Sequence, residues 1–138
     1  MSIQLSAYLL FNGQCEEAFR FYEKCLGGKI VAMLPYEGSP AAEQVPAEFR
    51  SKILHALLTV DGQSLMASDA PPGRYSEPKD FSVSLQIKDV REAERIFQAL
   101  AENGKVGMPF QETFWAARFG MVVDRFGTPW MVNCEKAA

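Results

Sequence analysis

Hydrophobic residues recur at three- and four-residue steps in two stretches of the chain, and the second stretch begins 75 residues after the first, at position 90 against position 15. This spacing gathers apolar side chains on one stripe of a helix and polar ones on the other. The pattern predicts amphipathic helices near Cys15–Leu26 and Val90–Ala101. Their apolar stripes are Cys15, Ala18, Phe19, Tyr22, Cys25 and Leu26 in the first helix, and Val90, Ala93, Ile96, Phe97 and Leu100 in the second.

Apolar runs of strand length surround each helix in the same order, one before it and three after it. In both halves the run that follows the helix starts with a Gly-Lys-aliphatic sequence, Gly28–Ile30 and Gly104–Val106. A duplicated β-α-β-β-β unit with two well-separated helices favours an α+β fold over an alternating parallel sheet. The eight expected strands are Leu5–Phe11, Ile30–Leu34, Ile53–Val60, Ser64–Ala67, Phe81–Ile87, Lys105–Met108, Trp115–Val123 and Pro129–Asn133.

The 138 residues are expected to form a single domain, residues 1–138, with module one at about 1–74 and module two at about 75–138. Asp69 precedes a proline pair and is interpreted as a turn-forming residue. The segment Pro35–Arg50 is rich in Pro, Gly, Ser, Ala and Glu and has no hydrophobic periodicity. We expect it to be a long loop that is either mobile or a cover over a site.

Charge and cysteine content exclude several classes of function. The 14 basic and 17 acidic residues give a net charge of −3, and no Lys/Arg stripe indicates nucleic-acid binding. No apolar run approaches the roughly 20 residues of a membrane span, and no secretory signal pattern occurs at the N-terminus. The three cysteines cannot pair completely, which favours buried free thiols in a reducing compartment. These features predict a cytoplasmic protein with neither nucleic acid nor membrane as partner.

The order of these motifs resembles a known family. A strand, a Glu-Glu-Ala helix at Glu16–Ala18, Leu-Gly-Gly at Leu26–Gly28 and the Asp-x-Phe-Gly-x-x-Trp hairpin at Asp124–Trp130 resemble the glyoxalase/bleomycin-resistance/dioxygenase superfamily, also called vicinal oxygen chelate proteins. The stretch Gln111–Ala116 and its neighbours look like the PhnB-like subgroup. The resemblance spans nearly the whole chain. It implies tandem β-α-β-β-β modules forming two curved mixed sheets around a cavity, usually in a homodimer.

Enzymes of that superfamily hold a divalent metal with side chains from an early and a late strand of each module. Carried over to this chain, the four ligand positions fall at Ala7, Met66, Ser82 and Met131. None of these is His, Asp or Glu, the ligands that suit such ions. A shift of two residues along a strand keeps the same face and adds only Asp80 as a strong ligand. We therefore expect no family-type metal centre and no cofactor.

His55, the only histidine, lies in an apolar strand. It is either hydrogen-bonded within the sheet or lines a cavity, where it could act as a general acid or base. Gln111–Trp115 crowds two aromatic rings, a carboxylate and an amide where strands should turn. Such residues either build a small-molecule site or plug the core while Glu112 is solvated. The predicted cavity and ligand-binding residues are His55, Glu112, Phe114 and Trp115, and no catalytic residue is assigned.

Three hypotheses about function remain open at the level of sequence. The first is a small-molecule-binding protein of the superfamily that lacks the family metal. The second is a lyase, isomerase or dioxygenase that uses an unanticipated metal site or acid-base chemistry by Glu112 and His55. The third is a dimeric scaffold whose own side chains fill its cavities. No glycine-rich nucleotide loop is present, which argues against a methyltransferase with a Rossmann-type cofactor site.

Overall fold

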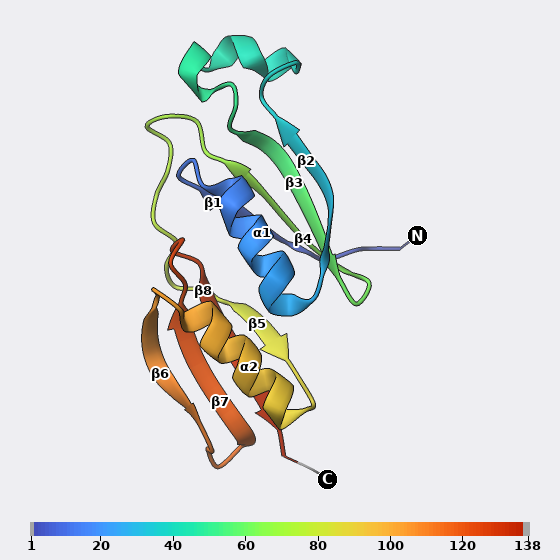
Figure 1. The fold of residues 1–138 in the computed structure, drawn as a ribbon, viewed down its shortest axis with the longest axis vertical. Coiled ribbons are helices and arrows are strands. Elements are labelled where there is room, and N and C mark those ends of the chain that lie inside the picture. The colour runs from blue at the N-terminus through green and yellow to red at the C-terminus, as the bar shows by residue number, and fades with distance from the viewer. Residues whose placement is uncertain (1, 137–138) are drawn as a thin grey trace. The chain divides into compact units, whose positions relative to one another are not determined.

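The computed structural model describes residues 2–136 and divides into two compact units, one ending at Ser76 and the other beginning at Glu77. Each unit contains a four-stranded sheet with one α-helix against one face (Figure 1). Neither helix has the length and hydrophobicity needed to cross a membrane. The units are described one at a time.

The first unit contains β1 (Ala7–Phe11), α1 (Cys15–Leu26), β2 (Lys29–Pro35), β3 (Ile53–Val60) and β4 (Gln63–Asp69). Its strands lie in the order β1-β4-β3-β2. The outer strand β1 runs parallel to β4, and the other neighbours are antiparallel. Two short 3₁₀ turns, η1 (Pro40–Gln44) and η2 (Ala47–Phe49), lie between β2 and β3.

The second unit repeats this plan with β5 (Val83–Gln86), α2 (Val90–Ala101), β6 (Lys105–Gln111), β7 (Ala116–Val123) and β8 (Pro129–Glu135). The strand order β5-β8-β7-β6 matches that of the first unit, again with one parallel and two antiparallel pairs. The predicted α+β fold with two mixed sheets is confirmed, and both helices have the predicted bounds. A cavity enclosed by the sheets remains a prediction.

Each helix buries its apolar stripe against its own sheet. In the first unit the rings of Phe11, Phe19 and Tyr22 pack with centroids 5.9–6.3 Å apart, and all three side chains are buried. In the second unit Phe97 of α2 stacks on Phe110 at 5.2 Å. These aromatic contacts account for much of the apolar area that each small unit removes from water.

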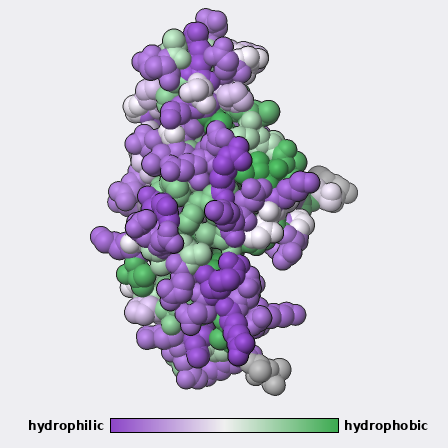
Figure 2. Space-filling model, in the orientation of Figure 1, coloured by the Kyte–Doolittle hydropathy of each residue, from purple (hydrophilic) through white to green (hydrophobic). Residues whose placement is uncertain are grey.

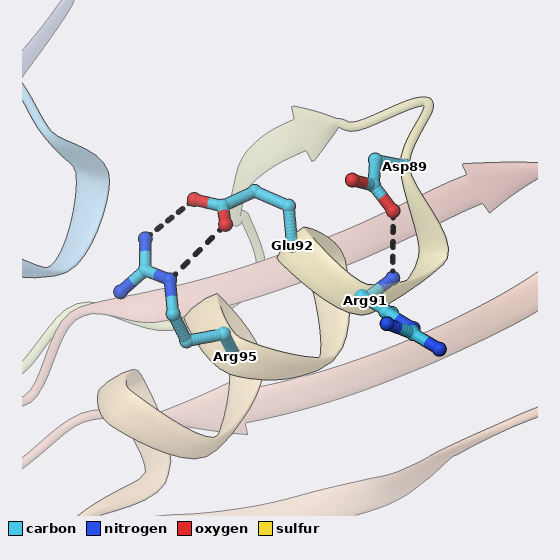
Figure 3. Close-up of polar contacts among 4 residues, drawn as sticks. All are labelled: Asp89, Arg91, Glu92 and Arg95. Carbon is cyan, nitrogen blue, oxygen red and sulfur yellow. Dashed lines mark hydrogen bonds and ion pairs between the residues drawn. The ribbon is translucent and has the colours of Figure 1, made fainter.

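Capping residues mark the end of α1 and the start of α2. Gly27 ends α1 in the left-handed conformation at φ 70° and donates its N–H to Glu23 O. At the start of α2, the Asp89 carboxylate accepts a 3.0 Å hydrogen bond from the Arg91 N–H, and Glu92 pairs with Arg95 (Figure 3). The hydrogen bond from Arg95 lowers the pKa of the Glu92 carboxyl.

The segment Pro35–Arg50 is more ordered than the sequence suggested. Besides η1 and η2, its Tyr36 N–H donates to Lys52 O, and the Tyr36 hydroxyl donates to Asp69 O at 2.8 Å. The Tyr36 ring also contacts Phe49, with centroids 5.5 Å apart. The segment is a long connection, as expected, and backbone turns and a buried tyrosine attach it to the first unit. Its role as a mobile segment or a cover over a site remains a prediction.

Asp69 differs from its interpretation as a turn residue. It is the last residue of β4 and is 1% exposed. Its carboxylate accepts hydrogen bonds from the backbone N–H groups of Cys15 at 2.9 Å and Ile53 at 2.8 Å. The side chain therefore joins the first turn of α1 to the first residue of β3.

The Gly-Lys-aliphatic repeat has a steric cause. A Cβ on Gly28 would lie 2.6 Å from Thr59 O, and one on Gly104 would lie 2.5 Å from Val123 O. In both units the chain leaving the helix passes directly against the end of the neighbouring antiparallel strand. Only glycine allows that approach.

Gly104→Ala is expected to lower the free energy of unfolding by roughly 1–3 kcal/mol, because the added methyl group must displace backbone atoms. Gly107→Ala is the matched control on β6, where a Cβ would meet only Met121 O at an ordinary 3.8 Å. The control is expected to be neutral or slightly stabilising. Urea unfolding of both variants measures the difference, and equal stabilities would contradict the steric explanation.

Candidate functional site

One face of the first sheet is not covered by α1. Successive side chains alternate between the two faces of a strand, and Phe11 packs against α1. Tyr8, Leu10 and Leu34 therefore project from the opposite face, where they are 47%, 50% and 54% exposed. We call this surface the first open face. Strand pairing places Tyr8, Leu10, Leu34, His55, Leu57 and Met66 on it, together with Ala32, Thr59, Ser64 and Ser68.

His55 lies on the first open face with a partner that the sequence did not reveal. The Tyr8 hydroxyl is 3.3 Å from His55 Nδ1, and the two rings have centroids 5.9 Å apart. Both residues are partly exposed, so the pair is within reach of solvent. The sequence held one indication of this contact, because Tyr8 is the only residue of β1 that carries a hydroxyl group.

The second sheet also has an uncovered face. Gly120 lies against the Phe97 ring of α2, so its neighbours on β7 point the other way. We call this surface the second open face. Strand pairing places Ser84, Gln86, Phe119, Met121, Met131 and Asn133 on it, with Lys105, Met108, Gln111, Val123, Pro129 and Glu135 around them. Three of its polar side chains are joined, because Asn133 Nδ2 donates to Gln86 Oε1 at 2.7 Å and Gln86 Nε2 donates to Ser84 Oγ at 3.2 Å.

The stretch Gln111–Trp115 forms the end of β6 and the connection to β7. Phe114 is 88% exposed and Trp115 49% exposed, so neither ring plugs the core. Their rings contact each other at 4.9 Å, and Trp115 contacts Phe119 at 5.4 Å. The connection therefore extends the second open face with two aromatic rings. Glu112 is exposed to solvent.

The four predicted ligand-binding residues belong to different units. His55 lies in the first unit, and Glu112, Phe114 and Trp115 lie in the second. Only Phe114 and Trp115 are in direct ring contact. In the view of Figure 2, hydrophilic residues cover most of the visible surface and hydrophobic ones form smaller areas.

Comparison with known proteins decides the family. The model of the glyoxalase/bleomycin resistance protein/dioxygenase superfamily matches residues 4–132. The chain belongs to this superfamily. It is 38% identical to protein YjdN of Escherichia coli over 140 residues, covering 96% of this chain and 95% of that protein.

Solved structures agree with this membership. Protein PA1353 from Pseudomonas aeruginosa is 52% identical and superposes with a TM-score of 0.90 over 99% of this chain and 100% of that chain. A Bacillus cereus PhnB protein, described as a putative 3-demethylubiquinone-9 3-methyltransferase, shares the fold with a TM-score of 0.81. That match is 23% identical and covers 96% of this chain and 99% of the other.

The early-strand residues counted along the sequence for the superfamily metal do not pair with the late-strand ones. Ala7 pairs with Leu65 and shares the helix side of the sheet with Phe11, whereas Tyr8 pairs with Met66 on the open face. In the second unit Ser82 precedes β5, and Ser84 is the residue that pairs with Met131.

The open-face pairs Tyr8–Met66 and Ser84–Met131 supply a phenol and a thioether in the first unit and a hydroxyl and a thioether in the second. Thioether sulfur is a soft donor, and neutral hydroxyl groups are weak ligands for zinc, manganese or magnesium. Among residues 2–136, no group of three or more His, Cys, Asp or Glu side chains is arranged to hold a metal ion. These residues do not fit the superfamily metal. Asp80, the remaining candidate ligand, is exposed, outside the strands and at φ 65°.

Other concave regions of the first unit lie away from its open face. A pocket of about 550 Å³ next to the start of α1 is lined by charged residues that include Glu16, Arg20 and Lys52. Another, of about 480 Å³, lies between the segment Pro35–Arg50 and the chain after β4 and is lined mainly by prolines, with Tyr36 and Arg74. His55 does not line either pocket.

The cysteines are not part of an exposed site. Cys15, Cys25 and Cys134 are all buried, as the sequence predicted, and none of the three forms a disulfide bond. Burial, followed by the nearby charges of Asp69 and Glu16, raises the pKa of the Cys15 thiol well above its usual range. In the folded protein this thiol stays protonated at neutral pH and is a poor nucleophile.

The raised pKa of Cys15 predicts a loss of stability at alkaline pH. The unfolded chain releases the thiol proton near the ordinary value of 9.0, whereas the folded chain keeps it. Folding therefore becomes less favourable above that pH, by up to about 1.4 kcal/mol per pH unit. Urea unfolding of wild type and Cys15→Ala from about pH 8 to about pH 10 should show a shallower decline in the variant. Parallel declines in the two proteins would contradict the assignment.

Proposed function

We propose that this superfamily member binds a small organic molecule on its open faces without the family metal. The observation that carries the proposal is the composition of these faces, where large apolar and aromatic side chains lie next to hydrogen-bonding groups. Binding sites for small molecules have this composition, and large apolar side chains are rarely left together on a surface without a role. The thioethers of Met66 and Met131 extend the apolar lining at the positions where the enzymes hold metal.

The named residues would contribute in distinct ways. Tyr8 and His55 offer a hydroxyl and an imidazole that can donate or accept hydrogen bonds. Phe114 and Trp115 offer ring faces for an apolar or aromatic part of the ligand. Glu112, exposed beside them, offers a carboxylate at the rim. The segment Pro35–Arg50 could act as a lid only if the buried hydrogen bond from Tyr36 to Asp69 broke.

A homodimer is part of the proposal, because a second copy of the chain could cover these apolar faces. Light scattering at micromolar concentration is expected to give twice the chain mass of 15.4 kDa. Exposed sheet faces and edges are normally paired or covered in stable proteins. A mass equal to one chain would contradict this expectation.

Acid-base catalysis is the second candidate function, and the Tyr8–His55 contact favours it. An imidazole next to a phenol can accept a proton from a bound substrate or donate one to it. In this case His55→Gln would leave ligand binding largely intact and abolish turnover. In a pure binding protein the same variant would change affinity alone.

The metal-free proposal predicts that protein purified without a chelator contains less than about 0.1 equivalent of divalent metal per chain. Native mass spectrometry combined with elemental analysis should report the metal content together with any retained organic ligand. Treatment with EDTA should leave the melting temperature unchanged. Near one equivalent of nickel, zinc, manganese or iron, lost in Met131→Leu or His55→Ala but retained in the control Met108→Leu, would establish the metal enzyme instead.

A further inference from the structure

Asn133, on the second open face, has a buried polar atom without a partner. Its Oδ1 is buried and makes no hydrogen bond to any of residues 2–136. Buried polar atoms in folded proteins are almost always hydrogen-bonded, because an unmade bond leaves the cost of desolvation uncompensated. Asn133 lies on an inner strand of the sheet, where it is paired with Gln86 on one side and with Phe119 on the other.

The hydrogen bonds among Asn133, Gln86 and Ser84 prevent the Asn133 Oδ1 atom from gaining a partner by rotation of the side chain. Its Nδ2 is already engaged at 2.7 Å with Gln86, which in turn contacts Ser84. Turning the amide would break the shorter of these bonds. Reversing the amides of both Asn133 and Gln86 would keep the two hydrogen bonds. It would, however, place the Asn133 Nδ2 donor where the Oδ1 acceptor now lies. Either arrangement leaves one unused hydrogen-bonding position at the same place.

The surroundings of this position are apolar and aromatic. Phe119 and Met131 are the neighbours of Asn133 on the same face, and Phe119 leads through Trp115 to the exposed ring of Phe114. The side chains that adjoin Asn133 on this face, Gln86, Phe119 and Met131, carry no charge. The charged residues of the face, Lys105 and Glu135, lie at strand ends. A neutral group is therefore favoured over an ion, whose desolvation these residues would not compensate.

We infer that the second open face recognises a neutral ligand that carries a hydroxyl or N–H amide group next to an aromatic ring. The polar group bonds to the Asn133 amide, and the ring packs against Phe119 and Trp115. Hydroxyl and amide groups both donate and accept hydrogen bonds, so they satisfy Asn133 in either orientation of its amide. This inference rests on the proposed function and specifies the chemistry of the ligand.

Two probes of nearly equal shape test the hydrogen bond. Benzyl alcohol carries the ring and a hydroxyl group, and ethylbenzene replaces that hydroxyl with a methyl group. Their affinities for the full-length protein are measured by chemical-shift titration, which follows the side-chain amide signals of Asn133 and Gln86. Fluorescence reports on Trp115, since Trp130 is buried and bonded to Asp124.

The affinity for benzyl alcohol relative to that for ethylbenzene is expected to fall about tenfold from wild type to Asn133→Leu. Leucine has a shape similar to that of asparagine but carries no amide. Asn133→Ala, which adds no bulk, should shift this ratio in the same direction. The matched control is Gln98→Leu, which removes an exposed amide on α2 and should leave the ratio unchanged.

An unchanged ratio in both Asn133 variants, or failure of benzyl alcohol to perturb the Asn133 and Gln86 signals, would overturn the inference. The polar position would then serve an ordered water only. If both probes bind this face with a ratio independent of Asn133, the proposed small-molecule binding survives and the hydrogen-bond assignment fails. If neither probe binds and the purified protein retains no ligand, both fail.

Discussion

The buried carboxylate of Asp69 is the contact on which the first unit depends. It lies at the end of β4 and accepts the backbone N–H groups of Cys15 and Ile53. The carbonyl of the same residue accepts the hydroxyl of Tyr36. Four chain segments therefore meet at one residue, three of them through its side chain. Burial and the charge of Asp69 also raise the pKa of the Tyr36 hydroxyl, which keeps it protonated as the donor.

The second unit has the same topology but a different central carboxylate. Asp124 follows β7 and accepts the backbone N–H groups of Phe126 and Thr128 and the indole N–H of Trp130. This arrangement fixes the hairpin between β7 and β8, whereas Asp69 fixes the start of a helix. Strand order and helix placement are thus shared by the two units, while the polar contacts that stabilise them are not.

Sequence periodicity was sufficient to predict the helices and the duplicated strand order. Both helices are amphipathic, so a 3.6-residue period marks their bounds, and Gly28 and Gly104 mark the next strand in each unit. The open face was harder to predict. The run Leu5–Phe11 has no clear alternation of polar and apolar residues, so its sequence does not show whether Ala7 or Tyr8 lies beside Met66.

Side-chain contacts of the candidate site were harder to predict. The unusual composition around Phe114 and Trp115 drew attention to them but left open whether their rings plug the core or are exposed. The Tyr8–His55 contact joins residues 47 positions apart, and the contact between Asn133 and Gln86 spans the same separation. Such contacts depend on strand register, which a single sequence determines poorly when both faces are partly apolar.

The outer strands of each sheet differ in how they could meet another chain. Register shifts interrupt β2 and β6, and β6 also contains Pro109, which has no N–H to donate. The opposite edges, β1 and β5, are regular but only five and four residues long. Each sheet can therefore gain a neighbouring strand on one side only. Stacking of copies into an open-ended fibre needs two compatible edges, so this asymmetry favours closed assemblies over aggregation.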